Sequence, residues 1–429
     1  MAVTSSTSAQ RGRAAENGLF YGYVVVAAGT IAMALVFSVH YAFGVFFKPL
    51  SAEFHWTRAT TSGAFSLVWL MQGLLSIVMG GSTDRFGPRA VLSIGAVLIG
   101  GGYLLTSQTH ALWQLYLFYG ILVGAGLGST FVPLTSTTAR WFSERRGMMT
   151  GIVTSGVGIG ALVGPIAANW LVSNYNWRRS YVVLGALVLV GVLIAAQFLR
   201  LDPASMRRRS FGAGGHASRE SYTQPDGYGL TLAECACTVQ FWIVSVVFFC
   251  YGYTWTAILL HLSPHATDLG FSTTSAARMV AVIGGASIVG KVLLGIAADR
   301  IGNKMVYLIS FALMIVALLW LTVLVHEASF YAFALMFGLA YGGLATAHSP
   351  LVAWLFGIRK HGLIFGVCFN SFTLGCAVGP IMAGHIFDET HSYKLAFLIC
   401  SAMCSIGLLM TLALKPACVE PNGLPAESA

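Results

Sequence analysis

One lysine stands inside an otherwise apolar stretch of this sequence. Lys291 lies eight residues before Asp299, within a run from 274 to 298 that is long enough to cross a membrane. An α-helix rises about 1.5 Å per residue, so Lys291 would sit about 12 Å deeper than that charged end. A cation at this depth costs roughly 2.5–3.5 kcal/mol. No apolar run supplies an acidic partner, which favours reversible binding of an anion. The alternative is an amine that reaches along its stem to the cytosolic surface.

Other polar and aromatic residues on the apolar runs could bind the same anion. A phenol, imidazole or amide can hydrogen-bond a carboxylate, and aromatic rings could wall its apolar part. Ordinary packing inside a helical bundle is the alternative for each of them. The candidates beside Lys291 are Tyr41, His40, Phe131, Tyr253, Trp255, Tyr341 and Asn370. The candidates for carrying a proton are Lys291, His40 and His348.

Two short charged loops carry the same pattern 215 residues apart. Gly80-x-x-x-Asp84-Arg85-x-Gly87-x-Arg89 aligns with Gly295-x-x-x-Asp299-Arg300-x-Gly302-x-Lys304. A carboxylate at such a position can accept hydrogen bonds from the N-terminus of a neighbouring helix, and the cations can face anionic groups. We expect a cytosolic gate formed by Asp84, Arg85, Arg89, Asp299, Arg300 and Lys304. The alternative is a cluster of cytosolic positive charge that only orients the chain.

The repeat extends through the whole chain. Gly151, Gly160, Gly164 and Pro165 recur at the same offset as Gly366, Gly375, Gly379 and Pro380. The glycines should let helices approach closely, and the prolines should bend them. A duplicated half of about 215 residues in an apolar chain is typical of membrane transporters built from two similar bundles.

Composition identifies the environment of the chain. The 429 residues are 56% hydrophobic and 9% charged, against about 25% charged in a soluble domain. The net charge of +9 resides in short loops between apolar runs, so we expect a lipid bilayer and no nucleic acid as partner. Cys235-x-Cys237 lacks a second ligand pair, so no metal or other cofactor is expected.

Twelve apolar runs have the length of a membrane-spanning helix. They are residues 20–47, 59–82, 90–107, 112–138, 147–172, 179–199, 238–262, 274–298, 304–325, 328–354, 362–387 and 394–414. If both termini are cytosolic, 17 of the 24 Lys and Arg residues lie on the inner side and 6 outside. The excess of basic residues on the cytosolic side favours this orientation.

These runs predict an all-α polytopic membrane protein with twelve helices in two pseudo-symmetric six-helix bundles. The polar stretch after the sixth run should form a mobile linker that ends in a short surface helix. The predicted organisation is a tail at 1–19, a bundle at 20–199, a cytosolic linker at 200–237, a bundle at 238–414 and a tail at 415–429.

The repeated loops resemble the signature of the major facilitator superfamily, and this resemblance covers essentially the whole chain. Further segments resemble the branch of monocarboxylate transporters and oxalate–formate antiporters. These are Phe43-Gly44-Val45-Phe46-Phe47-Lys48-Pro49-Leu50 with Glu53-Phe54-x-Trp56, Arg140-Trp141-Phe142, and His261-x-x-Pro264 through Gly270. The resemblance implies a central cavity between two bundles that rock around a site in the middle of the membrane.

Three positions depart from that branch. Lys291 stands where the family has an arginine that grips the carboxylate, and lysine supplies a point charge instead of a bidentate fork. Ser287 replaces an aspartate used in proton coupling, and Tyr41 replaces a lysine. The oxalate–formate antiporters carry a second lysine at approximately the position that Cys368 occupies in this chain. One cation instead of two favours a monoanion over a dicarboxylate.

The resemblance and Lys291 together predict a secondary transporter, not an enzyme, that moves a small organic monocarboxylate with a proton. We expect a single working chain in the plasma membrane, a bacterial inner membrane in particular, with both termini cytosolic. A carboxylate exchanger and a proton-driven drug exporter remain alternatives. Gly151 to Pro165 resembles the glycine stripe of drug antiporters, although Ala168-Asn169 replaces its closing pair and no run holds a carboxylate for a cationic drug.

Overall fold

The computed structural model describes residues 20–56, 58–142, 145–201, 229–324 and 326–417, and these are almost entirely helical. The predicted N-terminal tail and most of the linker and of the C-terminal tail lie outside these ranges, whereas the short helix predicted at the linker's end is present as α12 (Leu232–Ala236). The backbone pairing outside the helices is an isolated bridge between Gly229 and Gly357, with no strand in the described ranges. The predicted all-α class is confirmed.

Twelve helical segments in the described ranges are long and apolar enough to cross a membrane, as predicted. Ten of them are single helices: α4 (Arg58–Phe86), α5 (Pro88–Thr106), α9 (Arg146–Asn174), α10 (Trp177–Gln197), α13 (Val239–Asp268), α14 (Thr273–Ile301), α15 (Asn303–Leu321), α16 (Glu327–Phe356), α17 (His361–Thr390) and α18 (Lys394–Leu412). The other two are divided into shorter helical pieces.

The first and fourth spans are the divided ones. The first consists of α2 (Tyr21–Tyr41) and the start of α3 (Phe43–Phe54). The fourth runs through α6 (Leu112–Leu115), the π-helical stretch η1 (Tyr116–Val123), α7 (Gly124–Leu127) and α8 (Phe131–Trp141). Its counterpart in the repeat, α16, is a continuous α-helix. The repeat therefore does not extend to every backbone detail.

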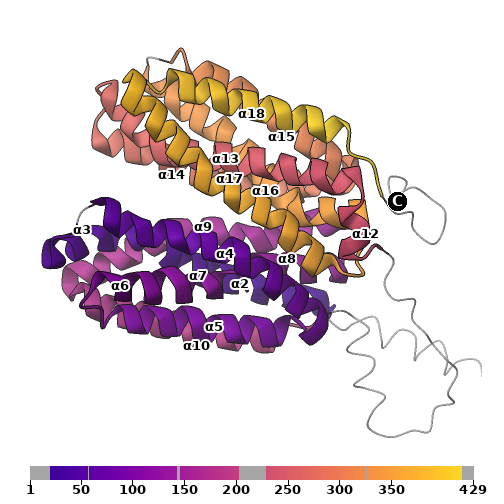
Figure 1. Ribbon diagram of the computed structural model, residues 1–429, viewed down its shortest axis with the longest axis horizontal. Coiled ribbons are helices and arrows are strands. Elements are labelled where there is room, and N and C mark those ends of the chain that lie inside the picture. Colours follow the sequence, from indigo (N-terminus) through magenta and orange to yellow (C-terminus); the bar gives the residue numbers. More distant parts are fainter. Residues whose placement is uncertain (1–19, 57, 143–144, 202–228, 325, 418–429) are drawn as a thin grey trace, which may run out of the picture.

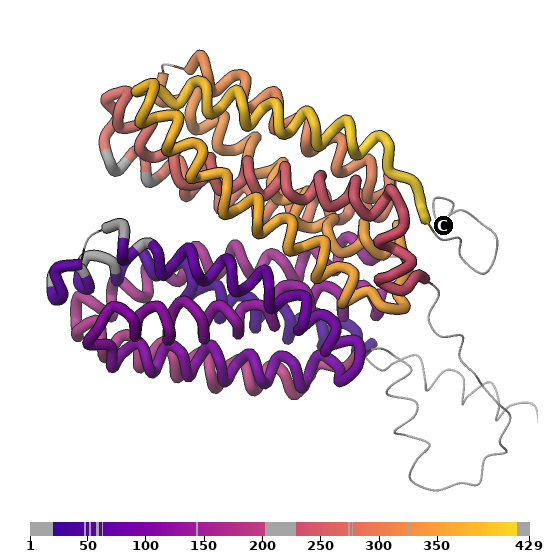
Figure 2. Tube along the Cα trace, in the orientation of Figure 1, coloured from indigo at the N-terminus to yellow at the C-terminus, as the bar shows by residue number. Residues whose placement is uncertain are grey.

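The helices form two groups, which we call the first half (α2–α10) and the second half (α13–α18) (Figure 1). We call the end where α10 finishes and α12 begins the linker end. The two groups touch there and separate toward the opposite end, which we call the outer end (Figure 2). Between the halves, α4 packs along α17 and α9 packs along α14.

Glycines allow the two halves to approach at the linker end. Gly80 of α4 faces Gly362 of α17, and Gly147 of α9 faces Gly295 of α14. A methyl group added at any of these four positions would overlap a backbone carbonyl oxygen of the facing helix. Because lipid provides no hydrophobic drive for helix association, this close backbone packing is what dispersion forces require.

Glycines further along α9 and α17 pack inside their own half. Gly164 of α9 lies against Ser38 of α2, and Gly379 of α17 lies against Tyr253 of α13. Pro165 and Pro380 follow within the helices, which continue past them for several residues. Each glycine stripe thus connects one helix both to its own half and to the other half.

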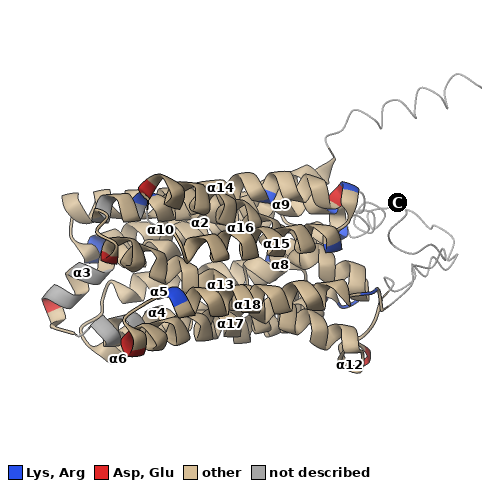
Figure 3. Ribbon diagram, turned by 90° about the horizontal axis from the view of Figure 1, so that it is seen from above, with Lys and Arg blue, Asp and Glu red and all other residues tan. Residues whose placement is uncertain are grey.

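Charged side chains gather near the two ends of the helices, and the middle of the bundle is nearly free of them (Figure 3). Among the side chains that the structure describes, Lys291 is the only buried Lys, Arg, Asp or Glu, with 1% of its surface exposed. A membrane protein keeps charges out of the apolar layer unless they have a function there. The single exception therefore marks the middle of this fold.

Candidate functional site

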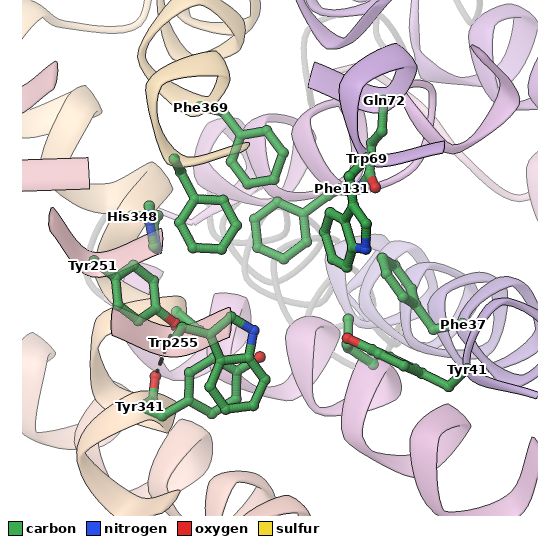
Figure 4. A pocket seen from close by; sticks show the side chains of 13 residues that line it. Phe37, Tyr41, Trp69, Gln72, Phe131, Tyr251, Trp255, Tyr341, His348 and Phe369 are labelled. Atoms are coloured by element: carbon green, nitrogen blue, oxygen red, sulfur yellow. Dashed lines mark hydrogen bonds between the residues drawn. The ribbon is translucent and has the colours of Figure 1, made fainter. Parts of the chain in front are cut away.

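A cavity lies between the two halves, with side chains from both around it (Figure 4). The first half contributes Phe37, Tyr41, Trp69, Gln72, Phe131 and Val157. The second half contributes Tyr251, Trp255, Tyr341, Ala345, His348, Phe369 and Phe372. The centre of a water molecule can occupy about 40 Å³ of the cavity, which is room for only a few waters. In this conformation the cavity suits a small or thin ligand.

Several of the predicted residues line this cavity, namely Tyr41, Phe131, Trp255, Tyr341 and His348. Tyr253 does not line it, because successive helical residues are about 100° apart and the cavity faces Tyr251 and Trp255 on α13 instead. The sequence offers no signal that distinguishes the two tyrosines, because Phe249 and Tyr253 are four residues apart just as Tyr251 and Trp255 are. Tyr253 packs near the Phe249 ring, with centroids 6.4 Å apart.

Two other predicted residues also lie beside the cavity without lining it. His40 is fully buried, with its ring stacked on Phe65 at 5.1 Å between centroids. Neither ring nitrogen of His40 has a hydrogen-bond partner among the described residues. Asn370 faces Gly73 of α4, in the contact between the two halves. Its neighbours on α17, Phe369 and Phe372, are the ones that reach the cavity.

Lys291 borders the cavity from α14 without lining it directly. Its Nζ lies 5.2 Å from the centroid of the Tyr341 ring, and Tyr341 does line the cavity. The Thr346 hydroxyl donates to the Lys291 carbonyl oxygen at 3.1 Å, which ties α16 to α14 at this level. Within the described ranges, the Lys291 ammonium forms no ion pair. The cation–π contact with Tyr341 is a modest substitute for an anion.

The Tyr341 ring is held in place by its neighbours on α13. It stacks on Trp255 with centroids 3.6 Å apart and an interplanar angle of 4°. The Tyr251 hydroxyl donates to the Tyr341 carbonyl oxygen at 3.3 Å (Figure 4). These contacts hold Tyr341 against α13, so the Lys291 ammonium beside its ring lies close to the cavity wall.

Two buried polar side chains of the cavity lining lack partners among the described residues. These are Gln72 at its Oε1 atom and His348 at both ring nitrogens. Gln72 is 1% exposed and His348 is 2% exposed. A buried polar group without a partner costs free energy, so such atoms in a cavity are available to a ligand or to water.

Two phenylalanines close the cavity toward the linker end. Phe131 from the first half and Phe369 from the second half stack with centroids 5.0 Å apart and an interplanar angle of 16°. Phe369 lies eight residues after His361, where α17 begins at the linker end. The stack is therefore about 12 Å from that end, on the floor of the cavity. The break in the fourth span at Gly128–Thr130 precedes Phe131, which begins α8.

Asp84 and Asp299 bind helix N-termini of the opposite half at the linker end. The Asp84 carboxylate accepts hydrogen bonds from the backbone N–H groups of Gly362 and Leu363 at 3.1 and 3.0 Å. The Asp299 carboxylate accepts from those of Gly147 and Met148 at 2.6 and 2.8 Å. Each carboxylate satisfies N–H groups that a helix leaves free in its first turn, and also meets the positive end of the helix dipole.

The basic residues predicted for the same gate behave differently. Arg85, Arg89 and Arg300 are exposed and form no ion pair within the described ranges. Lys304 donates from Nζ to the carbonyl oxygens of Leu412 and Leu414, both at 3.0 Å, and thereby binds the end of α18 in its own half.

The cation that does reach an acidic gate residue is one that the gate prediction omitted. Arg140 contacts Asp84 at 2.6 Å, with side chains only 12% and 5% exposed. The signal available was the position of Arg140 just after the apolar run 112–138, at the same predicted cytosolic face as the repeated acidic loop.

At the outer end, Glu53 ties α3 to α10. Its carboxylate accepts from the Trp177 indole at 2.5 Å and pairs with the Arg178 guanidinium at 2.7 Å. Arg178 also donates to the carbonyl oxygens of Ser107 and Thr109, both at 2.9 Å. The hydrogen bond from Trp177, followed by the contact with Arg178, lowers the pKa of the Glu53 carboxyl below its ordinary value. These contacts account for Glu53 in the segment that resembled the monocarboxylate branch.

The family can now be identified. The model of the Major Facilitator Superfamily matches residues 28–291 and 244–428. The chain belongs to this superfamily. It is therefore a membrane transporter and not an enzyme, and the resemblance noted in the sequence is confirmed.

Curated relatives from animals and from a bacterium match most of the chain. Rat monocarboxylate transporter 13 is 28% identical over 93% of this chain and 91% of its own length. Mouse monocarboxylate transporter 12 is 26% identical over 89% and 82%. The uncharacterized MFS-type transporter YhjX of Escherichia coli strain K12 is 26% identical over 81% and 84%.

Solved structures share the same fold. The transporter FucP, crystallised in the outward conformation, matches with a TM-score of 0.71 at 14% identity, over 92% of this chain and 100% of its own. The human organic anion transporter MFSD10 matches with a TM-score of 0.68 at 15% identity, over 91% and 99%. At these identities the similarity concerns the fold alone.

Proposed function

We propose that this transporter moves a small organic monocarboxylate across the membrane by alternating access, together with a proton. The relatives named monocarboxylate transporters support this substrate class. The observation that carries the proposal is the buried Lys291 ammonium, which lacks an ion-pair partner within the described ranges and borders a cavity between the two halves.

An anion is the ligand that best completes this site. A buried cation is costly without a counter-charge, and a carboxylate that replaces the missing partner would form a charge-assisted hydrogen bond. Among the described residues, the cavity lining includes no Asp or Glu, so a cationic drug would meet aromatic faces but no opposite charge there. The small free volume also disfavours a bulky compound in this conformation.

Alternating access requires contacts that form in one state and break in the other. The Asp84 and Asp299 contacts join the halves at the linker end and would have to release for the cavity to open there. With the linker end cytosolic, as the basic residues favour, the present arrangement is closed to the cytosol. We propose that the protein resides in the plasma membrane, that it works as a single chain, and that its linker end faces the cytosol.

Proton coupling follows from the same lysine. Burial disfavours the charged form of Lys291, whereas a carboxylate bound beside it favours that form. Binding of the anion therefore recruits a proton to the site, and the pair crosses without net charge. Ser287 lies one turn before Lys291 and donates to the Gly284 carbonyl oxygen at 2.7 Å, so it offers no acidic relay.

Uptake into proteoliposomes tests this proposal. We expect an inward proton gradient to drive accumulation of labelled lactate, pyruvate or formate, and no transport of a fluorescent cationic dye. Lys291→Ala should abolish both the uptake and its pH dependence, whereas Lys291→Arg should retain part of the binding. Undiminished, pH-dependent uptake by Lys291→Ala would refute the proposal. Dye transport without carboxylate transport would favour the drug exporter.

A further inference from the structure

The cavity wall is mainly aromatic, and this composition restricts the cargo beyond its carboxylate. Nine of the 13 lining residues are Phe, Tyr or Trp, and the aliphatic side chains are Val157 and Ala345. A site for a short aliphatic acid needs no such wall. Aromatic faces gain most from a second flat, unsaturated ring, because offset stacking adds to the burial of apolar area.

The rings offer flat faces arranged in stacks. Phe131 and Phe369 are nearly parallel at 16°, and Trp255 and Tyr341 are parallel within 4°. The first stack joins the two halves, whereas the second lies within the second half next to Lys291. A planar ring in the cavity could lie against the face or edge of either stack with its carboxylate directed to Lys291.

The volume of the cavity agrees with a thin ligand. In a slot as thin as an aromatic ring, the centre of a water molecule can move only within a narrow layer between the two walls, so the volume open to it is small. The small volume of about 40 Å³ is therefore compatible with a flat molecule. A globular molecule with the same number of atoms would require the walls to move apart.

A second polar group lies away from Lys291. Gln72 is on α4 in the first half, and Figure 4 shows it across the cavity from Tyr341, the ring next to Lys291. Its Oε1 atom has no hydrogen-bond partner among the described residues although the side chain is 1% exposed. A buried amide of this kind gains a bond from any hydroxyl that reaches it, and is left unsatisfied by a purely apolar ligand end.

We propose that the preferred cargo is an aryl monocarboxylate with a hydroxyl group on the ring, remote from the carboxylate. The carboxylate binds Lys291, the ring stacks among the aromatic side chains and the hydroxyl binds Gln72. This inference rests on the proposed function, since it assumes a carboxylate at Lys291. It adds the shape of the cargo and the residue that selects it.

Competition of unlabelled acids with the uptake of a labelled aryl acid into proteoliposomes measures the preference for a flat ring and the preference for a hydroxyl group separately. The competitors are 4-hydroxybenzoate, benzoate, cyclohexanecarboxylate and lactate. Benzoate and cyclohexanecarboxylate have the same number of heavy atoms but differ in flatness, so their ratio reports stacking. We expect benzoate to compete roughly three- to tenfold better than cyclohexanecarboxylate. We expect 4-hydroxybenzoate to exceed benzoate by a similar factor.

Gln72→Leu should reduce the advantage of 4-hydroxybenzoate over benzoate to about one. The ratio is read within one preparation, so it does not depend on how much protein is reconstituted. Ser93→Ala, on the exposed side of α5, is the matched control and should keep the full ratio. The wild-type series decides the question of flatness even if Gln72→Leu fails to fold.

The possible failures are distinguishable. If lactate and cyclohexanecarboxylate compete as well as benzoate, the aryl inference is overturned while carboxylate transport stands. If Gln72→Leu keeps the hydroxyl advantage, Gln72 is not the selecting residue. If no carboxylate competes and Lys291→Ala changes nothing, the proposed function itself fails.

Discussion

Asp84 in the first half and Asp299 in the second are 215 residues apart and make the same contact in space. Each carboxylate accepts two backbone hydrogen bonds from the first turn of a helix in the opposite half. The surroundings differ. Asp84 also pairs with Arg140, whereas the position equivalent to Arg140 in the second half is Leu355.

The same contrast recurs in the middle of the bundle. Ser76, the equivalent of Lys291, donates its hydroxyl to the Gly73 carbonyl oxygen at 2.7 Å and packs against Gly366. Its hydroxyl already has a partner, whereas the Lys291 ammonium forms no ion pair within the described ranges. Backbone contacts are thus repeated between the halves, and these charged side chains are not. In the function that we propose, the departures from the repeat carry out binding and switching.

The largest expected effect separates Lys291 from Ser76. Lys291→Gln should weaken carboxylate binding by roughly 10- to 100-fold, because a hydrogen bond between charged groups contributes about 1.5–3 kcal/mol. Ser76→Ala should change binding less than about twofold, since its hydroxyl bonds only to the backbone. Carboxylate-dependent thermal stabilisation of the purified protein measures both. Equal losses in the two variants would contradict the division between scaffold and site.

The second comparison concerns the two carboxylates at the linker end. Asp84→Asn leaves the Arg140 guanidinium without its counter-ion and should favour opening of the linker end by about 2–3 kcal/mol. Asp299→Asn loses charged hydrogen bonds to a helix N-terminus but breaks no ion pair within the described ranges, and should shift the equilibrium by about 1 kcal/mol. Spin labels at the exposed positions Arg89 and Arg359 report the open fraction as a longer distance. A larger shift for Asp299→Asn would reverse the comparison.

Replacing Arg140 makes the first carboxylate site resemble the second. Arg140→Leu should favour opening by about 1–2 kcal/mol, because Asp84 keeps its two backbone hydrogen bonds. The double variant Asp84→Asn with Arg140→Leu should open less than the sum of the single variants predicts. The same spin-label distances measure the open fraction of each variant in this double-mutant cycle. Simple additivity would indicate that the two side chains do not interact energetically.

The smallest effect concerns the outer end, where the halves also differ. Glu53 and Arg178 form an ion pair, and the equivalent positions hold Asp268 and Tyr393. The pKa of Glu53 is below its ordinary value, so its contact stabilises the fold at neutral pH. This stabilisation is lost as the pH falls through the lowered pKa. Because the pair is partly exposed to solvent, we expect it to contribute under about 1 kcal/mol to the free energy of unfolding.

The equivalent phenol should not contribute to this acid dependence. Burial, with Asp268 and Asp388 nearby, raises the pKa of Tyr393, so it stays neutral from acidic to neutral pH. Thermal unfolding of wild type and Glu53→Gln in detergent tests the difference. The wild type should be the more stable at neutral pH, and the gap should close in acid. A gap that persists in acid would exclude the Glu53 carboxylate as its source.

Most of the fold could be predicted because the bilayer imposes simple rules on sequence. Apolar runs of about 20 residues must be helices, so the twelve spans followed from hydropathy alone. The ends were less accurate: the run predicted at 238–262 continues as α13 to Asp268. His265 and Asp268 are polar, but the helix continues through them because its last turns lie at the outer end of the bundle.

The direction of side chains was the part that sequence could not decide. Both Tyr251 and Tyr253 are aromatic residues on one apolar helix, and no acidic or basic pattern distinguishes their faces. Only the packing of α13 on α17 and α18 fixes which tyrosine meets the cavity. For the same reason Arg140, and not Arg85 or Arg89, pairs with Asp84.

The sequence by itself determined that the chain has twelve membrane-spanning runs, that its halves are related, and that one lysine stands in an apolar run without an acidic neighbour along the chain. These follow from composition, spacing and the cost of charge in an apolar layer. Tertiary structure decided which aromatic faces surround the cavity, and that Tyr341 lies next to the Lys291 ammonium. Helices from distant parts of the chain meet there, and their rotation about their own axes is set by packing against each other.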